Sequence, residues 1–283
     1  MAVNYLGVSK TAGLTRVIVA LVLMSLAVVV AAALGGGAFE AERLTPVFGD
    51  GGVYGILQAG GLFFFAFAGY ARIATLGEEV RQPERVIPRA IPLALGITLV
   101  VYVTVAVAAL GAAGADELAA SDAPLAAAVR AGTLNSLAPV VRVGAAIASL
   151  GVLLSLLAGV SRTTFAMADQ AEFPRFLAGV HPRFKVPHRA EIAVGVAVVA
   201  VVSVADLRSA IGFSSFAVLV YYAIANASAL TLRREERRWP RWLPVLGVAG
   251  CLTLAFTLPW LSVVVGAAVL AIGAAGFVAL LRR

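Results

Sequence analysis

The sequence predicts an all-α polytopic membrane protein with about eight transmembrane helices. The chain has 283 residues, of which 61% are hydrophobic and only 13% are charged, and its mean hydropathy is +0.97. Soluble proteins carry roughly 25% charged residues, whereas a run of about 20 apolar residues can cross the ~30 Å hydrocarbon core of a bilayer. The basic residues also gather in short segments between apolar runs, which is typical of membrane topology.

Eight apolar runs have the required length, and their ends fall at recognisable breaks. The first run ends at the glycines Gly35 to Gly37, which indicate a helix terminus. The fifth run is short, so we expect its ends to draw on Ala190 and Leu207, and a tight turn at Pro259 joins the last two runs. The predicted spans are residues 15–37, 51–76, 91–113, 137–166, 192–205, 209–232, 243–258 and 261–281.

The distribution of basic residues predicts the orientation. Of the 22 lysines and arginines, 17 precede the first span or follow the second, fourth, sixth and eighth spans. They are Lys10, Arg16, Arg81, Arg85, Arg89, Arg162, Arg175, Arg183, Lys185, Arg189, Arg233, Arg234, Arg237, Arg238, Arg241, Arg282 and Arg283. The other loops hold mostly acids: Glu40, Glu42, Asp50, Asp116, Glu117, Asp122 and Asp206. Because positive loops stay cytoplasmic, we expect an integral protein of the cytoplasmic (plasma) membrane with both termini in the cytoplasm.

A secretory signal peptide is a competing interpretation of the N-terminus, because Ala31 to Ala33 resemble a cleavage site. The apolar run from Val17 to Leu34 is longer than the roughly 7–15 residues usual in such signals. The length of this run favours a retained first span.

The second span contains a break. Aromatic residues from Phe63 run into the small-residue stretch Ala66-Phe67-Ala68-Gly69, and the segment leaves the membrane through Gly77-Glu78-Glu79 into a charged, proline-rich hairpin. A helix broken within a bilayer leaves backbone N–H and C=O groups unpaired, which is tolerated only where they face a cavity or a ligand. Such breaks mark the substrate sites of many secondary transporters. The alternative is a flexible helix with small packing residues.

The residues that enzymes or resident metals need are missing from the predicted spans. Both histidines, His181 and His188, fall in one loop, no span contains an aspartate, and Cys251 is the single cysteine. Metal sites need clustered His, Cys or carboxylate ligands, and phosphate-binding or dinucleotide-binding glycine motifs in their strand context are absent. We therefore expect no enzymatic activity, no cofactor, no metal site and no nucleic acid partner.

Three stretches of the sequence form an ordered set. They are the broken helix with its exit GEEVRQPERVIPRAI at 77–91, then Ser161-Arg162 with residues 165–168 and Phe173-Pro174, then residues 181–184 with Pro187. In this order they resemble the sixth helix, the end of the eighth helix and the following loop of amino acid–polyamine–organocation permeases, especially the branch similar to cationic amino acid transporters. Residues 4–8 resemble the loop that enters the fifth helix of the same family.

This resemblance implies a partial inverted-repeat transporter fold with a broken helix. If the first span is the family's fifth helix, residues 1–283 form a single transmembrane permease domain that covers helices five to twelve and lacks the first four. The implied function is that of a secondary transporter for amino acids or related amines, inactive without the missing N-terminal helices. The alternative is a non-transporting membrane scaffold or the remnant of a truncated transporter gene.

The family binds its substrate at the bilayer midplane between two broken helices, where the ends of half-helices meet charged groups. The resemblance therefore assigns substrate binding to the break itself. Backbone amides there could meet a carboxylate, and aromatic faces suit cationic groups. The expected substrate-binding residues are Phe65, Ala66, Phe67, Ala68 and Gly69.

Charged residues near the membrane surface form a candidate cytoplasmic gate. Arg72 follows a position where this branch of the family often has an acid, and it could act within the span or snorkel to the interface. The loop charges could likewise serve topology alone. The candidate gate residues are Arg72, Glu78, Glu79, Arg162 and Asp169.

The coupling ion is not indicated by the sequence. Apart from Arg72, the middle of each span is apolar or carries hydroxyls such as Ser155 and Ser161, and we expect no buried carboxylate that could carry a proton. Membrane hydroxyls more often bond to carbonyls of their own helix than to an ion. The expected partners are an amino acid or amine and the lipid bilayer, with a coupling proton, a sodium ion or exchange all left open.

Overall fold

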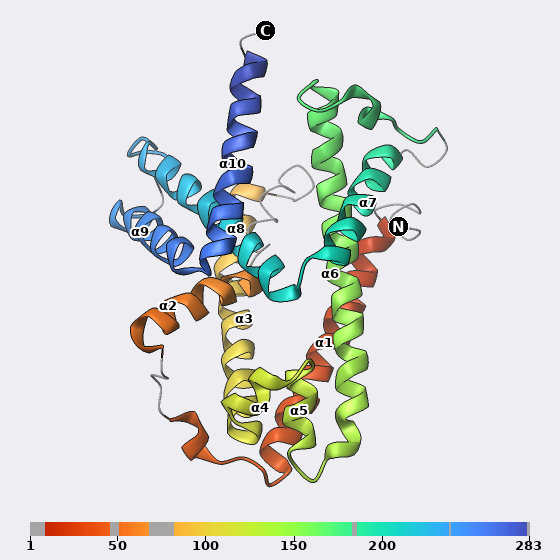
Figure 1. Ribbon diagram of the computed structural model, residues 1–283, viewed down its shortest axis with the longest axis vertical. Coiled ribbons are helices and arrows are strands. Elements are labelled where there is room, and N and C mark those ends of the chain that lie inside the picture. Colours follow the sequence, from red (N-terminus) through yellow and green to blue (C-terminus); the bar gives the residue numbers. More distant parts are fainter. Residues whose placement is uncertain (1–8, 46–50, 68–81, 183–185, 238, 282–283) are drawn as a thin grey trace. The chain divides into compact units, whose positions relative to one another are not determined.

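The computed structural model describes residues 9–45, 51–67, 82–182, 186–237 and 239–281, and every regular element in these ranges is a helix (Figure 1). The predicted all-α fold is confirmed. The helices belong to two compact units, Met1–Val47 with Thr98–Ser203 (unit 1) and Phe48–Ile97 with Val204–Arg283 (unit 2).

The elements divide between the two units as follows. Unit 1 contains α1 (Ser9–Gly35), η2 (Ala41–Leu44), the second part of α3 (Pro83–Ala113), α4 (Ala115–Ala120), α5 (Pro124–Arg130), η5 (Asn135–Leu137), α6 (Ala138–Asp169), η6 (Arg175–Ala178) and α7 (His188–Val204). Unit 2 contains α2 (Gly52–Phe63), η3 (Phe64–Phe67), the first part of α3, α8 (Leu207–Leu230), α9 (Trp242–Thr257) and α10 (Trp260–Leu281).

Each predicted span contains a helix. Within the described residues, five helical stretches are long and apolar enough to cross a membrane: Gly13–Gly35, Pro83–Ala113, Asn135–Asp169, Leu207–Leu230 and Trp260–Val278. Two shorter apolar stretches, Gly52–Phe67 and Trp242–Thr257, match the second and seventh predicted spans, and α7 matches the fifth. The chain is therefore an integral membrane protein.

Helix α3 begins at Pro83 rather than at residue 91, where the sequence analysis placed the start of the third span. Gln82 precedes the helix with φ 53°, and its carbonyl accepts hydrogen bonds from the N–H groups of Arg85 and Val86 at 3.0 and 3.1 Å. Proline fits the first helical position because the N–H there would have no partner within the helix. The expected proline-rich hairpin is therefore helical from Pro83 onward.

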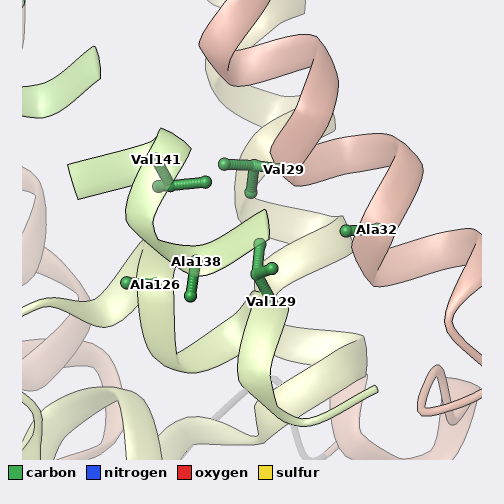
Figure 2. Close-up of a cluster of buried hydrophobic side chains, with 6 residues drawn as sticks. All are labelled: Val29, Ala32, Ala126, Val129, Ala138 and Val141. Carbon is green, nitrogen blue, oxygen red and sulfur yellow. The ribbon is translucent and has the colours of Figure 1, made fainter. Parts of the chain in front are cut away.

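Helices α1, α5 and α6 meet in a small apolar core in unit 1 (Figure 2). The short helix α5 buries the four consecutive residues Ala126 to Val129, so it is enclosed on every side rather than amphipathic. No span is predicted for this segment, which falls between the predicted spans 91–113 and 137–166. The core residues are Val29, Ala32, Ala126, Val129, Ala138 and Val141.

Glycines allow two close approaches in unit 1. A Cβ atom on Gly144 would lie 2.1 Å from Ser25 Oγ, so α6 meets α1 where there is no room for a side chain. Gly36 and Gly132 touch backbone to backbone, because a Cβ on Gly132 would lie 2.9 Å from the Gly36 carbonyl oxygen. The Thr133 N–H also donates to that oxygen at 3.0 Å. The end of α1 is thus tied to the loop after α5.

The segment after α1 closes onto the end of α3. The Glu40 N–H donates to the Gly111 carbonyl at 2.9 Å, and the ring of Phe39 fills the space that a side chain on Gly111 would need. Arg43 pairs with Glu40 at 3.1 Å between Nε and Oε2, and its Nη1 donates to the Ala112 carbonyl. Backbone, ring and ion-pair contacts together make this segment part of the packed unit.

In unit 2, α8 packs against both α9 and α10. Phe216 and Leu219 of α8 form a buried cluster with Ala255 and Leu258. Helix α10 approaches at Gly266, where a Cβ would lie 2.3 Å from Cδ1 of Phe216. Small residues at such crossings let transmembrane helices pack closely, so a bulky ring on α8 is accommodated by a glycine on α10.

Candidate functional site

The end of α2 is where the sequence analysis expects a broken helix. The chain is α-helical to Phe63 and continues through Phe64–Phe67 as the 3₁₀-helix η3. The Phe64 N–H still donates to the Gly60 carbonyl, so the winding changes directly after that bond. Turns of 3₁₀-helix are frequent at the ends of α-helices, and they also occur at functional hinges within longer helices. Ala68 and Gly69, the rest of the expected break, lie outside the described residues.

One side of this segment packs against α8. The Phe64 ring meets the Tyr222 ring with centroids 5.7 Å apart, and Leu62 and Phe64 both border the buried cluster of unit 2. Ser215 is fully buried, and its hydroxyl donates to the Leu62 carbonyl at 3.5 Å. The last carbonyls of a helix lack partners within the helix, so this bond helps to satisfy the end of α2. Helix α8 therefore contacts one side of the segment 62–64, where the α-helix ends.

The other side of the segment is open. Phe63 and Phe65 are 52% and 42% exposed, and Ala66 is exposed as well. Phe67 is half-buried, with its ring centroid 5.7 Å from that of Phe63. The structure thus places Phe65 and Ala66 of the expected site on the open side, while Phe64 packs into the helix interface. Exposed aromatic faces attract ammonium groups.

Polar and small residues of α2 attach it to α9. Gln58 donates from Nε2 to the Thr257 carbonyl at 3.1 Å, at the end of α9. A Cβ on Gly61 would lie 3.0 Å from both the Leu254 carbonyl oxygen and Leu258 Cδ2, so glycine permits this approach without displacing either group. The segment that leads into the break therefore rests on two supporting helices, α8 and α9.

The candidate gate is only partly described. Arg72, Glu78 and Glu79 lie outside the described residues. Arg162 and Asp169 belong to α6 in unit 1, and both are exposed. No ion pair joins Arg162 to Asp169 in the part of the chain that the structure describes. The gate stays a prediction.

Helix α7 begins with a buried carboxylate that the sequence analysis did not expect. The helix starts at His188, before the predicted span at residue 192, and places Glu191 in its first turn with 5% exposure. Within the described ranges, neither Glu191 Oε1 nor His188 Nδ1 has a hydrogen-bond partner. The His181 ring lies edge-on to His188, with centroids 5.4 Å apart. The expectation of no buried carboxylate is therefore wrong, because it considered the spans alone.

The hydroxyls of α6 differ in their bonding. Thr163 and Thr164 donate to the carbonyls of Gly159 and Val160, at 3.1 and 2.9 Å, as expected for membrane hydroxyls. Ser161 is 2% exposed, and its Oγ has no hydrogen-bond partner among the described residues. Nor does any group of three or more His, Cys, Asp or Glu side chains in those residues have the arrangement to hold a metal ion.

Sequence reasoning did not single out the residues that support the break. Ser215 and Tyr222 lie seven positions apart in α8, a spacing that places both on one helix face, and this periodicity was an available signal. Gln58 was a second signal, because an amide within an apolar helix usually bonds across to a neighbour. These polar residues hold the helix that carries the candidate site.

Comparison with known proteins identifies the family. Residues 1–279 match the family model described as amino acid permease. The chain belongs to the amino acid permease family. This agrees with the three stretches that resemble amino acid–polyamine–organocation permeases, and it places the chain among permeases rather than enzymes.

Several relatives are similar to most of this chain. An uncharacterized transporter of Mycobacterium tuberculosis is 61% identical over 276 residues, which cover 98% of this chain and 62% of the relative. The branched-chain amino acid permease BcaP of Bacillus subtilis is 27% identical over 268 residues, covering 92% and 57%. Cationic amino acid transporter 4 of Homo sapiens is 31% identical over 193 residues, covering 68% and 30%. The chain therefore spans less than two thirds of the length of each of these relatives.

Proposed function

We propose that this permease chain forms the substrate-binding part of a secondary transporter that moves amino acids or related amines across the cytoplasmic membrane. The observation that carries the proposal is the change from α-helix to 3₁₀-helix at Phe64, in a chain of the amino acid permease family. Phe65 and Ala66 are exposed directly beside this change. A helix broken after this point would present backbone dipoles to a charged substrate.

The proposed substrate site comprises Phe65, Ala66, Phe67, Ala68 and Gly69. Backbone N–H groups at the break would receive the substrate carboxylate, since the start of a half-helix attracts negative charge. The Phe65 ring would face the ammonium group or an aliphatic side chain of the substrate. One break can in this way bind both charged ends of an amino acid.

The packed side of the segment supports this role. A binding site discriminates best when its residues stand on a rigid frame, and Phe64 and Leu62 are fixed against α8 while Gln58 is fixed to α9. The relatives named as branched-chain and cationic amino acid carriers support an amino acid as the substrate class. Proton coupling, sodium coupling and exchange are all compatible with the proposal.

The charged residues form the second part of the proposal. Arg72, Glu78 and Glu79, together with Arg162 and Asp169, would exchange partners as the transporter alternates between its states. Exposed ion pairs contribute only ~0–1 kcal/mol each. Ion pairs this weak are suitable for a gate, because an alternating carrier needs two states whose free energies differ by only a few kcal/mol. Both termini would lie on the same, cytoplasmic side.

Reconstitution tests the transport function. Residues 1–283 alone would be compared in proteoliposomes with a fusion to the part of the Mycobacterium tuberculosis relative that lies outside the match. Uptake of radiolabelled branched-chain and cationic amino acids is measured under imposed proton and sodium gradients. We expect uptake by the fusion and none by residues 1–283 alone. A folded fusion that moves no amino acid under any gradient would favour a scaffold.

A pair of glycine variants tests the site within that fusion. Gly69→Leu should fill the break and lower uptake more than tenfold, since a substrate held by backbone groups loses its contacts when they are covered. Gly55→Leu is the matched control on the same span, because a Cβ at Gly55 meets nothing within 4 Å. Equal uptake by both variants would remove the break from the mechanism.

A further inference from the structure

The connection between α8 and α9 carries the densest group of arginines in the chain. Residues 233–241 hold five arginines and two glutamates, a net charge of +3. Helix α8 ends at Leu230 and α9 begins at Trp242, so the connection lies at the ends of two apolar helices, beside the membrane surface. Basic clusters next to transmembrane helices attract anionic lipids.

Only some of the charged side chains form hydrogen bonds within the connection. Arg237 donates from Nε to the Leu232 carbonyl at 3.0 Å, which satisfies the chain just after α8. The Glu236 carboxylate accepts from the backbone N–H of Arg233 at 3.0 Å, and no ion pair joins it to a guanidinium group of another described residue. One of the two acids in the connection is therefore bound to the main chain.

Three arginines and two tryptophans remain open to the surroundings. Arg233, Arg234 and Arg241 are exposed, and none of them forms an ion pair with another described residue. Trp239 and Trp242 are 64% and 60% exposed. Exposed tryptophans next to apolar helices are typical of the headgroup region of a bilayer, where an amphipathic ring has one apolar and one wet side.

We propose that these five residues, the arginine–tryptophan patch, bind the headgroups of anionic phospholipids. A guanidinium group donates two parallel hydrogen bonds to phosphate oxygens, and the indole rings would pack beside the glycerol and acyl carbons of the same lipid. Free phosphate would satisfy the arginines but leave both tryptophans without an apolar partner. The combination therefore favours a lipid over a soluble anion, and it requires no transport activity.

The three tryptophans of the chain make the site measurable. Trp260 lies at the start of α10, beyond the end of α9 opposite to Trp242. A Trp260→Phe variant reports on the patch alone, and a Trp239→Phe/Trp242→Phe variant reports on Trp260 alone. Each is placed in phosphatidylcholine vesicles that contain a small, equal fraction of brominated phosphatidylglycerol or brominated phosphatidylcholine, and quenching of tryptophan fluorescence is compared.

For the patch reporter, brominated phosphatidylglycerol should quench more strongly than brominated phosphatidylcholine, with a local enrichment of about fivefold for each arginine that binds. The Trp260 reporter should show no preference. The preference should be abolished in a triple variant that combines Arg233→Gln, Arg234→Gln and Arg241→Gln. A second triple variant with lysine at the same three positions should retain most of the preference. Raising the salt concentration should weaken it.

Two results would overturn the proposal. One is equal quenching of the patch reporter by the two brominated lipids, or a preference that the glutamine variant keeps. The other is loss of the preference when inorganic phosphate is added at constant ionic strength, which would show that the arginines bind a free anion instead. The lysine variant controls for folding, because it keeps the charge while changing the same three positions.

Discussion

The ring of Tyr222 in α8 lies edge-on to the ring of Phe64 in η3, with centroids 5.7 Å apart and ring planes inclined at 75°. Phe64 is the first residue of η3, and Tyr222 belongs to the helix that holds one side of the proposed break. The pair therefore links the orientation of the break to a fixed helix. Loss of this contact should alter substrate binding.

Tyr222→Leu should raise the KM for amino acid uptake by the transport-competent fusion about two- to tenfold. An edge-to-face aromatic pair contributes ~0.5–1.5 kcal/mol beyond the area that it buries, and loss of the pair loosens the start of η3. Tyr222→Phe keeps the ring and should stay closer to the parent KM. The measurement is uptake as a function of substrate concentration. An unchanged KM in the leucine variant would mean that the pair does not position the break.

Gly266→Val should destabilise unit 2 by about 1–3 kcal/mol, the usual cost of overpacking, because its Cβ would meet the ring of Phe216 at 2.3 Å. Gly273→Val is the control on the same helix, since a Cβ there meets nothing within 4 Å. Thermal unfolding in detergent should show a lower midpoint for the first variant alone. Equal midpoints would show that α10 does not approach α8 at Gly266.

Cysteines placed at Asp122 and Arg237 should react with membrane-impermeant reagents from opposite sides. The background is Cys251→Ser, which removes the single native cysteine. Asp122 lies between α4 and α5 and should be external, whereas Arg237 lies in the arginine-rich connection and should be cytoplasmic. Reaction of both from one side of intact cells would overturn the predicted orientation.

Glu79→Gln should change the uptake rate of the fusion up to about fivefold, as expected for removal of one exposed pair worth ~0–1 kcal/mol. If Glu79 pairs with Arg162 in one state, the exchange Glu79→Arg with Arg162→Glu should restore the rate. Glu117→Gln is the control, since α4, which carries this acid, lies between predicted spans on the predicted outer side. A Glu79→Gln variant with the parent rate would leave the loop charges a topological role only.

The fold could be predicted to a large extent because the apolar runs are long and the charges lie between them. Two features of the fold could not be predicted from the sequence pattern, because one depends on local hydrogen bonds and the other on packing between helices. The early start of α3 depends on the Gln82 carbonyl and on the tolerance of Pro83 at a helix start. The burial of α5 depends on α1 and α6, which enclose a helix too short for a periodicity argument.

The candidate site stays a prediction, and the sequence indicates the segment that would carry it without indicating which side chains are exposed. Small residues after the phenylalanines indicate where a helix can break, and the helix changes from α to 3₁₀ at Phe64, shortly before them. Which phenylalanine packs and which stays open depends on the position of Tyr222, which no local pattern specifies. Glu191 was missed for a similar reason, because its burial at the start of α7 depends on tertiary packing that no local pattern specifies.

The contact between Gly36 and Gly132 sets a limit on how this protein can vary. At most packing contacts a larger residue on one side can be offset by a smaller residue on the other. Here both partners already lack a side chain, and each would meet the other's main chain. A change at either position can be accommodated only if the end of α1 and the loop after α5 move apart. Two positions far apart in the sequence are therefore subject to one shared steric constraint.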